Sequence, residues 1–239
     1  MLLSWKNSGS YNDCQEMRED LNIRELIRSC SYSCGWVNYT EDALNYLEYV
    51  INIFIYVDNN ISNIKNDSIT INKSYSILKR NLDILIDKIN YEYKYFKNEE
   101  KTLLIEKNPS STAVAEIVEE ELAFKVLEYN HHLLKGNINR KKEILKALAD
   151  KIEPFRKDLD KGLSLDFGFA ANELNIRHNN LEGEKKVPYV ANMNEEELEI
   201  WYDKTYQIML LCILENEYNK SIKKTFKQLR KDKDEYKKS

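Results

Sequence analysis

Apolar residues recur at alternating steps of three and four positions along several stretches of the chain, as they do on a helix that buries one face. A first stripe follows Thr40, a favourable N-cap residue, and consists of Leu44, Leu47, Val50, Ile51, Phe54 and Ile55. A second stripe predicts one long helix with a narrow apolar seam, made of Tyr75, Leu78, Leu82, Leu85, Ile89, Tyr93 and Phe96. The polar residues 58–68 between the two stripes predict a loop.

Turn-forming residues divide the second half of the chain into further helices. Residues 108–112, with the sequence Asn-Pro-Ser-Ser-Thr, predict a break and a helix cap, and a helix is expected from about residue 113 to residue 135. Gly136 suits the position just past that helix, because glycine adopts a left-handed backbone without strain. The next helix is expected to begin at Asn137 or Asn139.

Residues that mark helix ends also divide the last third of the chain. Pro154 must kink or restart the helix that it interrupts, because proline has no backbone N–H. Residues 163–176 predict a helix, and residues 179–193 predict a polar loop. Asn194 and Glu197 have the spacing of a capping box and predict the start of a final long helix. The buried face of that helix is expected to hold Leu198, Trp201, Thr205, Ile208 and Cys212.

Composition also favours helices. The 239 residues include 6 Gly and 3 Pro, which is few for a fold with many short strands and tight turns. A hydrophobic content of 42% is enough for a packed core. We therefore predict an all-α helical bundle with about six substantial helices. Its expected parts are an N-terminal helical region 1–108, a second helical region 109–219 and a basic tail 220–239, together forming one compact domain.

Charge is distributed unevenly along the chain. Residues 220–239 hold nine Lys and Arg and three Asp and Glu, so this tail carries +6 and leaves −10 for residues 1–219 out of a total of −4. An acidic body argues against non-specific duplex binding as the main activity. The basic tail either contacts nucleic acid or is a solvated helix end.

The chain shows no signal peptide and no membrane-spanning segment. Its longest apolar run, near residues 50–57, is short and contains an asparagine. We therefore expect a cytoplasmic protein with reduced thiols and no membrane association. Cys30 and Cys34 lie one helical turn apart without a second pair, and the dipeptide His131-His132 has no ligand partner at metal-binding spacing. No metal and no cofactor is expected.

The tetrad Arg177-His178-Asn179-Asn180 carries the strongest candidate chemistry. Arg177 can hold a phosphate through two hydrogen bonds, and His178 can move a proton near neutral pH. In metal-free RNA cleavage, His178 would shift the 2′-hydroxyl proton and Arg177 would stabilise the phosphorane, with Asn179 and Asn180 lining the RNA site. The same four residues also suit a structural helix C-terminus, where cations and a left-handed Asn are favourable.

Two aromatic residues one turn into the last helix are further candidates. Trp201 and Tyr202 have the planar rings on which an RNA base stacks. Aromatic residues at helical spacing also belong to cores, and the stripe that contains Trp201 favours a core position. Both interpretations predict a helix here, and they differ in whether the rings are exposed.

From about residue 113 to residue 218 the chain resembles bacterial helical proteins of the abortive-infection type, within or near the HEPN superfamily. The segments that carry the resemblance are Leu134–Asn137, Lys141–Pro154, Asn175–Asn180 and Tyr189–Tyr206. The resemblance implies an all-helical fold, dimerisation, metal-independent RNA cleavage and a role in phage defence or toxin systems. The family's signature separates the Arg from the His by several residues, whereas His178 directly follows Arg177 here.

The leading hypothesis is a HEPN-like helical protein of a bacterial phage-defence or toxin-type system, acting as a metal-independent ribonuclease or an RNA-binding protein. It is expected to form a homodimer and to work with RNA and with a partner protein of the defence system. The alternative is a non-catalytic helical adaptor or sensor module, in which Arg177–Asn180 is a structural helix cap. A DNA-binding regulator is disfavoured by the acidic body and by the lack of a helix-turn-helix pattern.

Overall fold

The computed structural model describes residues 39–61, 69–99, 101–178 and 188–236. The chain forms two compact units, residues 1–45 and residues 46–239. The contacts described below are those within the second unit. Within the described ranges, no helix is long and apolar enough to cross a membrane.

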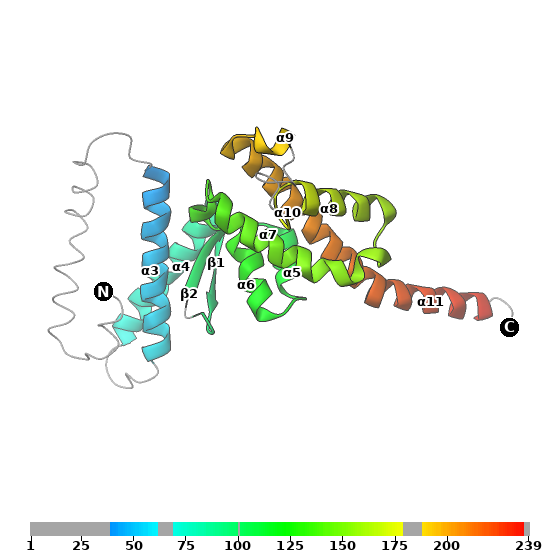
Figure 1. The fold of residues 1–239 in the computed structure, drawn as a ribbon. Coiled ribbons are helices and arrows are strands. Elements are labelled where there is room, and N and C mark those ends of the chain that lie inside the picture. Colours follow the sequence, from blue (N-terminus) through cyan, green and yellow to red (C-terminus); the bar gives the residue numbers. More distant parts are fainter. Residues whose placement is uncertain (1–38, 62–68, 100, 179–187, 237–239) are drawn as a thin grey trace. The chain divides into compact units, whose positions relative to one another are not determined.

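Helices make up most of the described chain (Figure 1). They are α3 (Tyr39–Ile61), α4 (Ile69–Lys88), α5 (Pro109–Ala115), α6 (Glu120–Glu128), α7 (Ile138–Ile152), α8 (Lys161–Glu173), α9 (Pro188–Ala191), α10 (Glu195–Glu217) and α11 (Lys223–Tyr236). Two strands, β1 (Tyr91–Phe96) and β2 (Lys101–Glu106), form an antiparallel hairpin. The mostly helical prediction is confirmed, with eight helices of seven or more residues in the described ranges instead of about six.

The hairpin replaces the end of a predicted helix. A single helix from Tyr75 to Phe96 is wrong, because α4 ends at Lys88 and the chain turns at Asn90, whose backbone is left-handed with φ 63°. The following sequence alternates aromatic and charged side chains, which suits a strand with one buried face. Strand β2 then supplies a partner with a buried centre, in which three adjacent apolar residues are at most 1% exposed: Leu103, Leu104 and Ile105.

The predicted starts of two helices, α7 and α10, and the predicted cap before α5 are confirmed, although α5 begins at Pro109 and not near residue 113. The side chains of Asn108 and Asn137 each accept a hydrogen bond from the backbone N–H three residues ahead, at the starts of α5 and α7. Asn194 and Glu197 exchange the two hydrogen bonds of a capping box at the start of α10. These caps satisfy backbone N–H groups that have no partner inside the helix.

The predicted continuous helix over 113–135 is wrong. Helices α5 and α6 are separate, and a 3-10 turn at His132–Leu134 follows α6. The break contains the β-branched residues Ile117 and Val118, which fit a helix less well than unbranched ones. The predicted helix end at Gly136 is also wrong, because α6 ends at Glu128, but Gly136 does have the predicted left-handed backbone, with φ +76°, after the 3-10 turn.

Two further boundaries were predicted from polar residues and proline. The restart at Pro154 is confirmed, since α7 gives way to a 3-10 turn at Glu153–Asp158 with Pro154 in its first turn. The predicted loop 58–68 overlaps α3, which runs to Ile61, and residues 62–68 lie outside the described ranges.

Helix α10 is the centre of the core and packs against α5, α7 and α8 (Figure 1). Its buried side chains are Leu198, Tyr202, Thr205, Tyr206, Met209, Leu210, Cys212 and Ile213. The predicted burial of Trp201 is wrong, because its side chain is 43% exposed and Tyr202 takes the core position. Ile208 is half-buried at the edge of the core.

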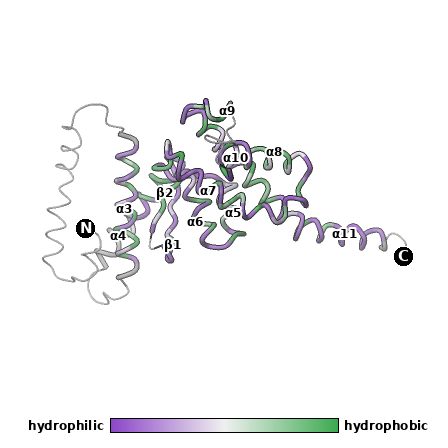
Figure 2. Tube along the Cα trace, viewed as in Figure 1, coloured by the Kyte–Doolittle hydropathy of each residue, from purple (hydrophilic) through white to green (hydrophobic). Residues whose placement is uncertain are grey.

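The basic tail continues α10 through a π-helical turn at Tyr218–Ile222 into α11. Residues 223–234 all have exposed side chains. Figure 2 shows α11 as mostly hydrophilic, which agrees with its many lysines. The positive charge of the tail is therefore carried by a solvent-facing helix.

Candidate functional site

The candidate site is built around the end of α8. The helix closes at Leu174, and Asn175 follows with a left-handed backbone of φ 58°. This conformation is uncommon for residues other than glycine, and asparagine is among the few that tolerate it. The chain then folds back, so that the backbone N–H of Arg177 donates to the carbonyl of Ala171 at 3.0 Å. A left-handed Asn therefore does end this helix, two residues before Arg177.

Asn175 joins the end of α8 to α7. It is 5% exposed, and its Oδ1 accepts a hydrogen bond from Lys142 Nζ of α7 at 3.0 Å. On the α10 side, burial raises the pKa of the Tyr202 phenol to about 12, and the nearby Asn175 side chain partly opposes that rise. A buried polar side chain that bonds to a neighbouring helix holds the α8 terminus in a fixed position.

Lys142 and Lys146 form a like-charge pair one turn apart on α7. Burial lowers the pKa of Lys142, and the nearby charge of Lys146 lowers it further. Among the described residues, neither ammonium has a carboxylate within ion-pair distance. On the same helix, Arg140 and Lys141 each pair with two carboxylates and Lys151 pairs with one. An anion bound between Lys142 and Lys146 would relieve their mutual repulsion.

The two predicted catalytic residues follow this junction directly. The guanidinium of Arg177 donates from Nη1 to Glu153 Oε2 at 2.8 Å. Both side chains are partly exposed, so water and salt screen this ion pair and a phosphate can compete for Arg177. His178 is exposed and open to solvent. The predicted RNA-binding residues Asn179 and Asn180 lie outside the described residues.

The two aromatic candidates have different surroundings. Trp201 is on the exposed side of α10, with Lys204 Nζ 4.5 Å from the centre of its ring. A cation beside an exposed indole is a favourable setting for a stacked, negatively charged nucleotide. Tyr202 is fully buried, so its ring packs in the core and a base cannot reach it in this structure.

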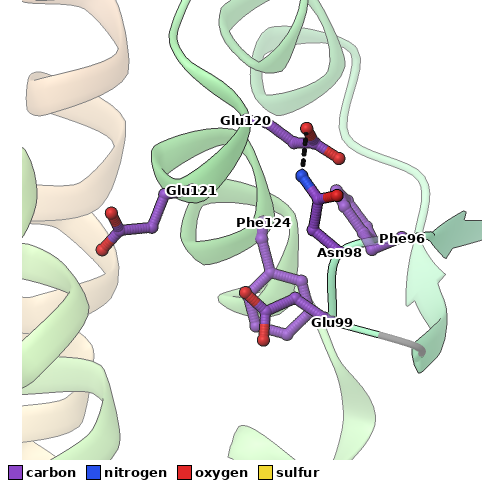
Figure 3. Close-up of a pocket in the computed structure, with 6 residues that line it drawn as sticks. All are labelled: Phe96, Asn98, Glu99, Glu120, Glu121 and Phe124. Atoms are coloured by element: carbon purple, nitrogen blue, oxygen red, sulfur yellow. Dashed lines mark hydrogen bonds between the residues drawn. The ribbon is translucent and has the colours of Figure 1, made fainter.

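Two hollows lie elsewhere on the described surface. One, of about 110 Å³, is lined by Phe96, Asn98, Glu99, Glu120, Glu121 and Phe124 (Figure 3). Asn98 donates to Glu120 there, and three glutamates give the hollow a charge that repels phosphate. The other, of about 390 Å³, is open and is bordered by Glu92, Lys107, Asn108, Pro109, Thr112, Ala113 and Glu116. Neither hollow contains a predicted site residue.

Sequence reasoning missed the parts of this site that come from other helices. Lys142 lies in a run of four basic residues within seven positions, Arg140–Lys146, and the sequence alone does not show which of them are neutralised by pairing. The helix predicted over 163–176 includes Asn175, which in the structure ends it. Comparison of the chain with known protein families, with curated proteins and with solved structures found no match. The site must therefore be interpreted from its own chemistry.

Proposed function

We propose that the chain acts on RNA through the end of α8, as a HEPN-like helical protein of a bacterial phage-defence or toxin-type system. One observation supports this most: Asn175 ties Lys142 to the turn that presents Arg177 and His178. Two lysines with no ion pair among the described residues then lie on α7, the helix that bonds to Asn175 two positions before Arg177. Phosphates of a single RNA strand are ligands that such a set of cations recognises.

The proposed chemistry needs no metal. His178 takes the proton of a ribose 2′-hydroxyl, and the freed oxygen attacks the adjacent phosphorus to form a 2′,3′-cyclic phosphate. The 5′-oxygen of the next nucleotide leaves and takes a proton from water. Arg177 leaves Glu153 for the phosphate and stabilises the charge that grows on the phosphorane. Lys142 and Lys146 hold a neighbouring phosphate, and Trp201 stacks a base. Each role is assigned to a side chain that solvent reaches at least in part.

The test is a cleavage assay on single-stranded RNA in the presence of EDTA. His178→Ala is expected to reduce cleavage by about 100-fold or more, because a general base is lost, while the melting temperature stays unchanged. The double variant Lys142→Ala/Lys146→Ala should weaken RNA binding, whereas the matched control Lys224→Ala/Lys227→Ala on α11 should not. Full cleavage by His178→Ala, or equal binding by both double variants, would contradict the assignment.

A non-catalytic adaptor or sensor module is the second candidate. It is favoured by the cap itself, since the backbone N–H of Arg177 bonds to Ala171 and its side chain bonds to Glu153. If the tetrad is only a cap, Arg177→Ala lowers the free energy of unfolding by about 0.5–2 kcal/mol and changes no RNA activity. The melting curve and the cleavage assay on this variant separate the two candidates.

We further propose that the protein works as a homodimer in the cytoplasm, together with a partner protein of the defence system. Side chains of the seam predicted for a helix interface are exposed on α4, with Leu78 at 60% and Leu85 at 45%. A second copy that covered them would remove apolar surface from water. Light scattering is expected to give twice the chain mass, and Leu78→Glu/Leu85→Glu should halve it. A monomeric wild type at micromolar concentration would rule this interface out.

A further inference from the structure

A cluster of metal-ligating side chains lies apart from the end of α8. Glu48 comes from α3, and His131 and His132 come from the turn after α6. One nitrogen of each imidazole and one carboxylate oxygen lie within 4.8 Å of one another. The Nε2 atom of His131 is 2.7 Å from Glu48 Oε2, and the two imidazole rings are 4.3 Å apart between centres.

The fold fixes the position of this cluster. The backbone of His131 pairs with Ile105 at the end of the hairpin, and the N–H of Glu106 donates to the carbonyl of Asn130 at 3.1 Å. The side chain of His131 is 4% exposed and that of Glu48 is 18% exposed. Ligands that packing already holds lose little freedom when a metal binds.

A hydrogen-bonded His–Glu pair with no metal is the simpler interpretation. His131 Nδ1 accepts a hydrogen bond from the backbone N–H of Leu133 at 3.3 Å, so Nε2 carries the ring proton and donates it to Glu48. This pair explains two of the three side chains. It does not explain why the tilted ring of His132 lies beside them, with a ring nitrogen within 4.8 Å of the other two ligand atoms.

We propose that Glu48, His131 and His132 bind a zinc ion. Two imidazoles and one carboxylate are a common zinc ligand set, and they leave a fourth position for water or a further ligand. The zinc takes the place of the Nε2 proton between His131 and Glu48, and the ring stays neutral by carrying its proton on Nδ1. A protonated Nδ1 cannot accept a hydrogen bond, so the long 3.3 Å contact with the Leu133 N–H is given up.

The distances require a modest adjustment. Zinc bonds of about 2.1 Å in a tetrahedral site place ligand atoms about 3.4 Å apart. The His131–Glu48 contact must therefore widen, and the longest separation in the cluster must shorten. His132 is half-buried and Glu48 has three side-chain torsions, so both can move while His131 stays in place.

Zinc titration of the chelator-treated full chain tests this site. The chain has three histidines, which gives a matched set of variants: His132→Ala removes a proposed ligand, and His178→Ala removes the histidine outside the cluster. Glu48→Gln keeps the shape of the third ligand but removes its charge. We expect one tightly bound zinc per wild-type chain, a melting temperature that rises with zinc concentration, and tetrahedral visible absorption with cobalt.

His132→Ala and Glu48→Gln should each weaken zinc binding by about tenfold or more, while His178→Ala should bind as the wild type does. Circular dichroism confirms that each variant is folded before it is scored. Absence of zinc binding by the wild type would overturn the proposal. So would equal affinity in His132→Ala, because that result assigns the zinc to other residues. RNA cleavage in EDTA is a separate measurement, so failure here leaves the proposed RNA function testable.

Discussion

Replacing Tyr206 with alanine is expected to lower the free energy of unfolding by about 3–5 kcal/mol, one of the largest effects of any single change in this chain. Tyr206 is 1% exposed in the middle of α10. Its ring stacks on Tyr129 with 3.9 Å between centres and 9° between planes. Truncation would leave a cavity between α10 and α6 that the surrounding helices fill only in part.

The hydroxyl of Tyr206 contributes separately. It donates to the carbonyl of Val126 at 2.6 Å, lies 2.9 Å from Ser111 Oγ, and accepts from Asn130 Nδ2 at 3.1 Å. The other side-chain donor to the Val126 carbonyl among the described residues is Asn130 Nδ2, at a long 3.5 Å, and the backbone N–H of Asn130 bonds to Leu127 instead. Tyr206→Phe is therefore expected to cost about 1–3 kcal/mol. Urea unfolding of both variants checks this, and a decrease under about 1 kcal/mol for Tyr206→Ala would contradict the described core.

The second large effect is expected at Lys141. Its ammonium is buried between α7 and α10, 2.8 Å from Glu199 and 2.6 Å from Asp203, and lies over the ring of Tyr129. Lys141→Ala leaves the carboxylate of Glu199, which is 17% exposed, without its counter-charge. We expect a decrease of about 3 kcal/mol in the free energy of unfolding. This is the lower end of the range for breaking a buried ion pair, because Asp203 is half exposed. Lys146 is on the same helix but exposed, so Lys146→Ala should change the free energy of unfolding by no more than about 0.5 kcal/mol.

The pH dependence gives this prediction a second test. Burial alone would raise the pKa of Glu199, but the hydrogen bonds from Lys141 and from the Gly136 N–H outweigh it and hold the pKa below its ordinary value. A folded-state pKa below that of the unfolded chain stabilises the protein above the ordinary glutamate pKa of about 4.3. This stability is lost as the pH falls through the folded-state pKa. The difference in the free energy of unfolding between wild type and Lys141→Ala should therefore become smaller on acidification. A difference that does not change with pH would show that the Lys141–Glu199 pair is not its cause.

The helix starts could be predicted because they depend on neighbours in sequence. A cap at Asn108 or Asn137 needs only a side-chain oxygen and a backbone N–H three residues away. The β1–β2 hairpin could not be recognised in the same way. Tyr93 fits both a three-four helical stripe, with Ile89 and Phe96, and an alternating strand, with Tyr91 and Tyr95, and the deciding factor is the pairing with β2.

The buried face of α10 shows a related ambiguity. This helix is buried over much of its circumference, so a stripe shifted by one residue looks equally apolar and selects Trp201 in place of Tyr202. The polar sites depend on packing between distant segments. Glu48 meets His131 across 83 positions, and Lys142 meets Asn175 across 33. Spacing along the sequence does not predict contacts between such distant residues. Residues with candidate chemistry could therefore be identified from the sequence, but the side chains that contact them could not.

The salt dependence of RNA binding tests the central claim most directly, because it counts phosphates held by the protein. The affinity of wild type for a short single-stranded RNA should fall steeply with salt. Removing Lys142 and Lys146 together should reduce the slope of log affinity against log salt concentration by about 0.7, the value expected for the one phosphate that the two lysines hold together. Removing Lys224 and Lys227 from α11 should leave the slope unchanged. An unchanged slope in the Lys142/Lys146 variant, or no RNA binding by the wild type, would contradict RNA recognition at the end of α8.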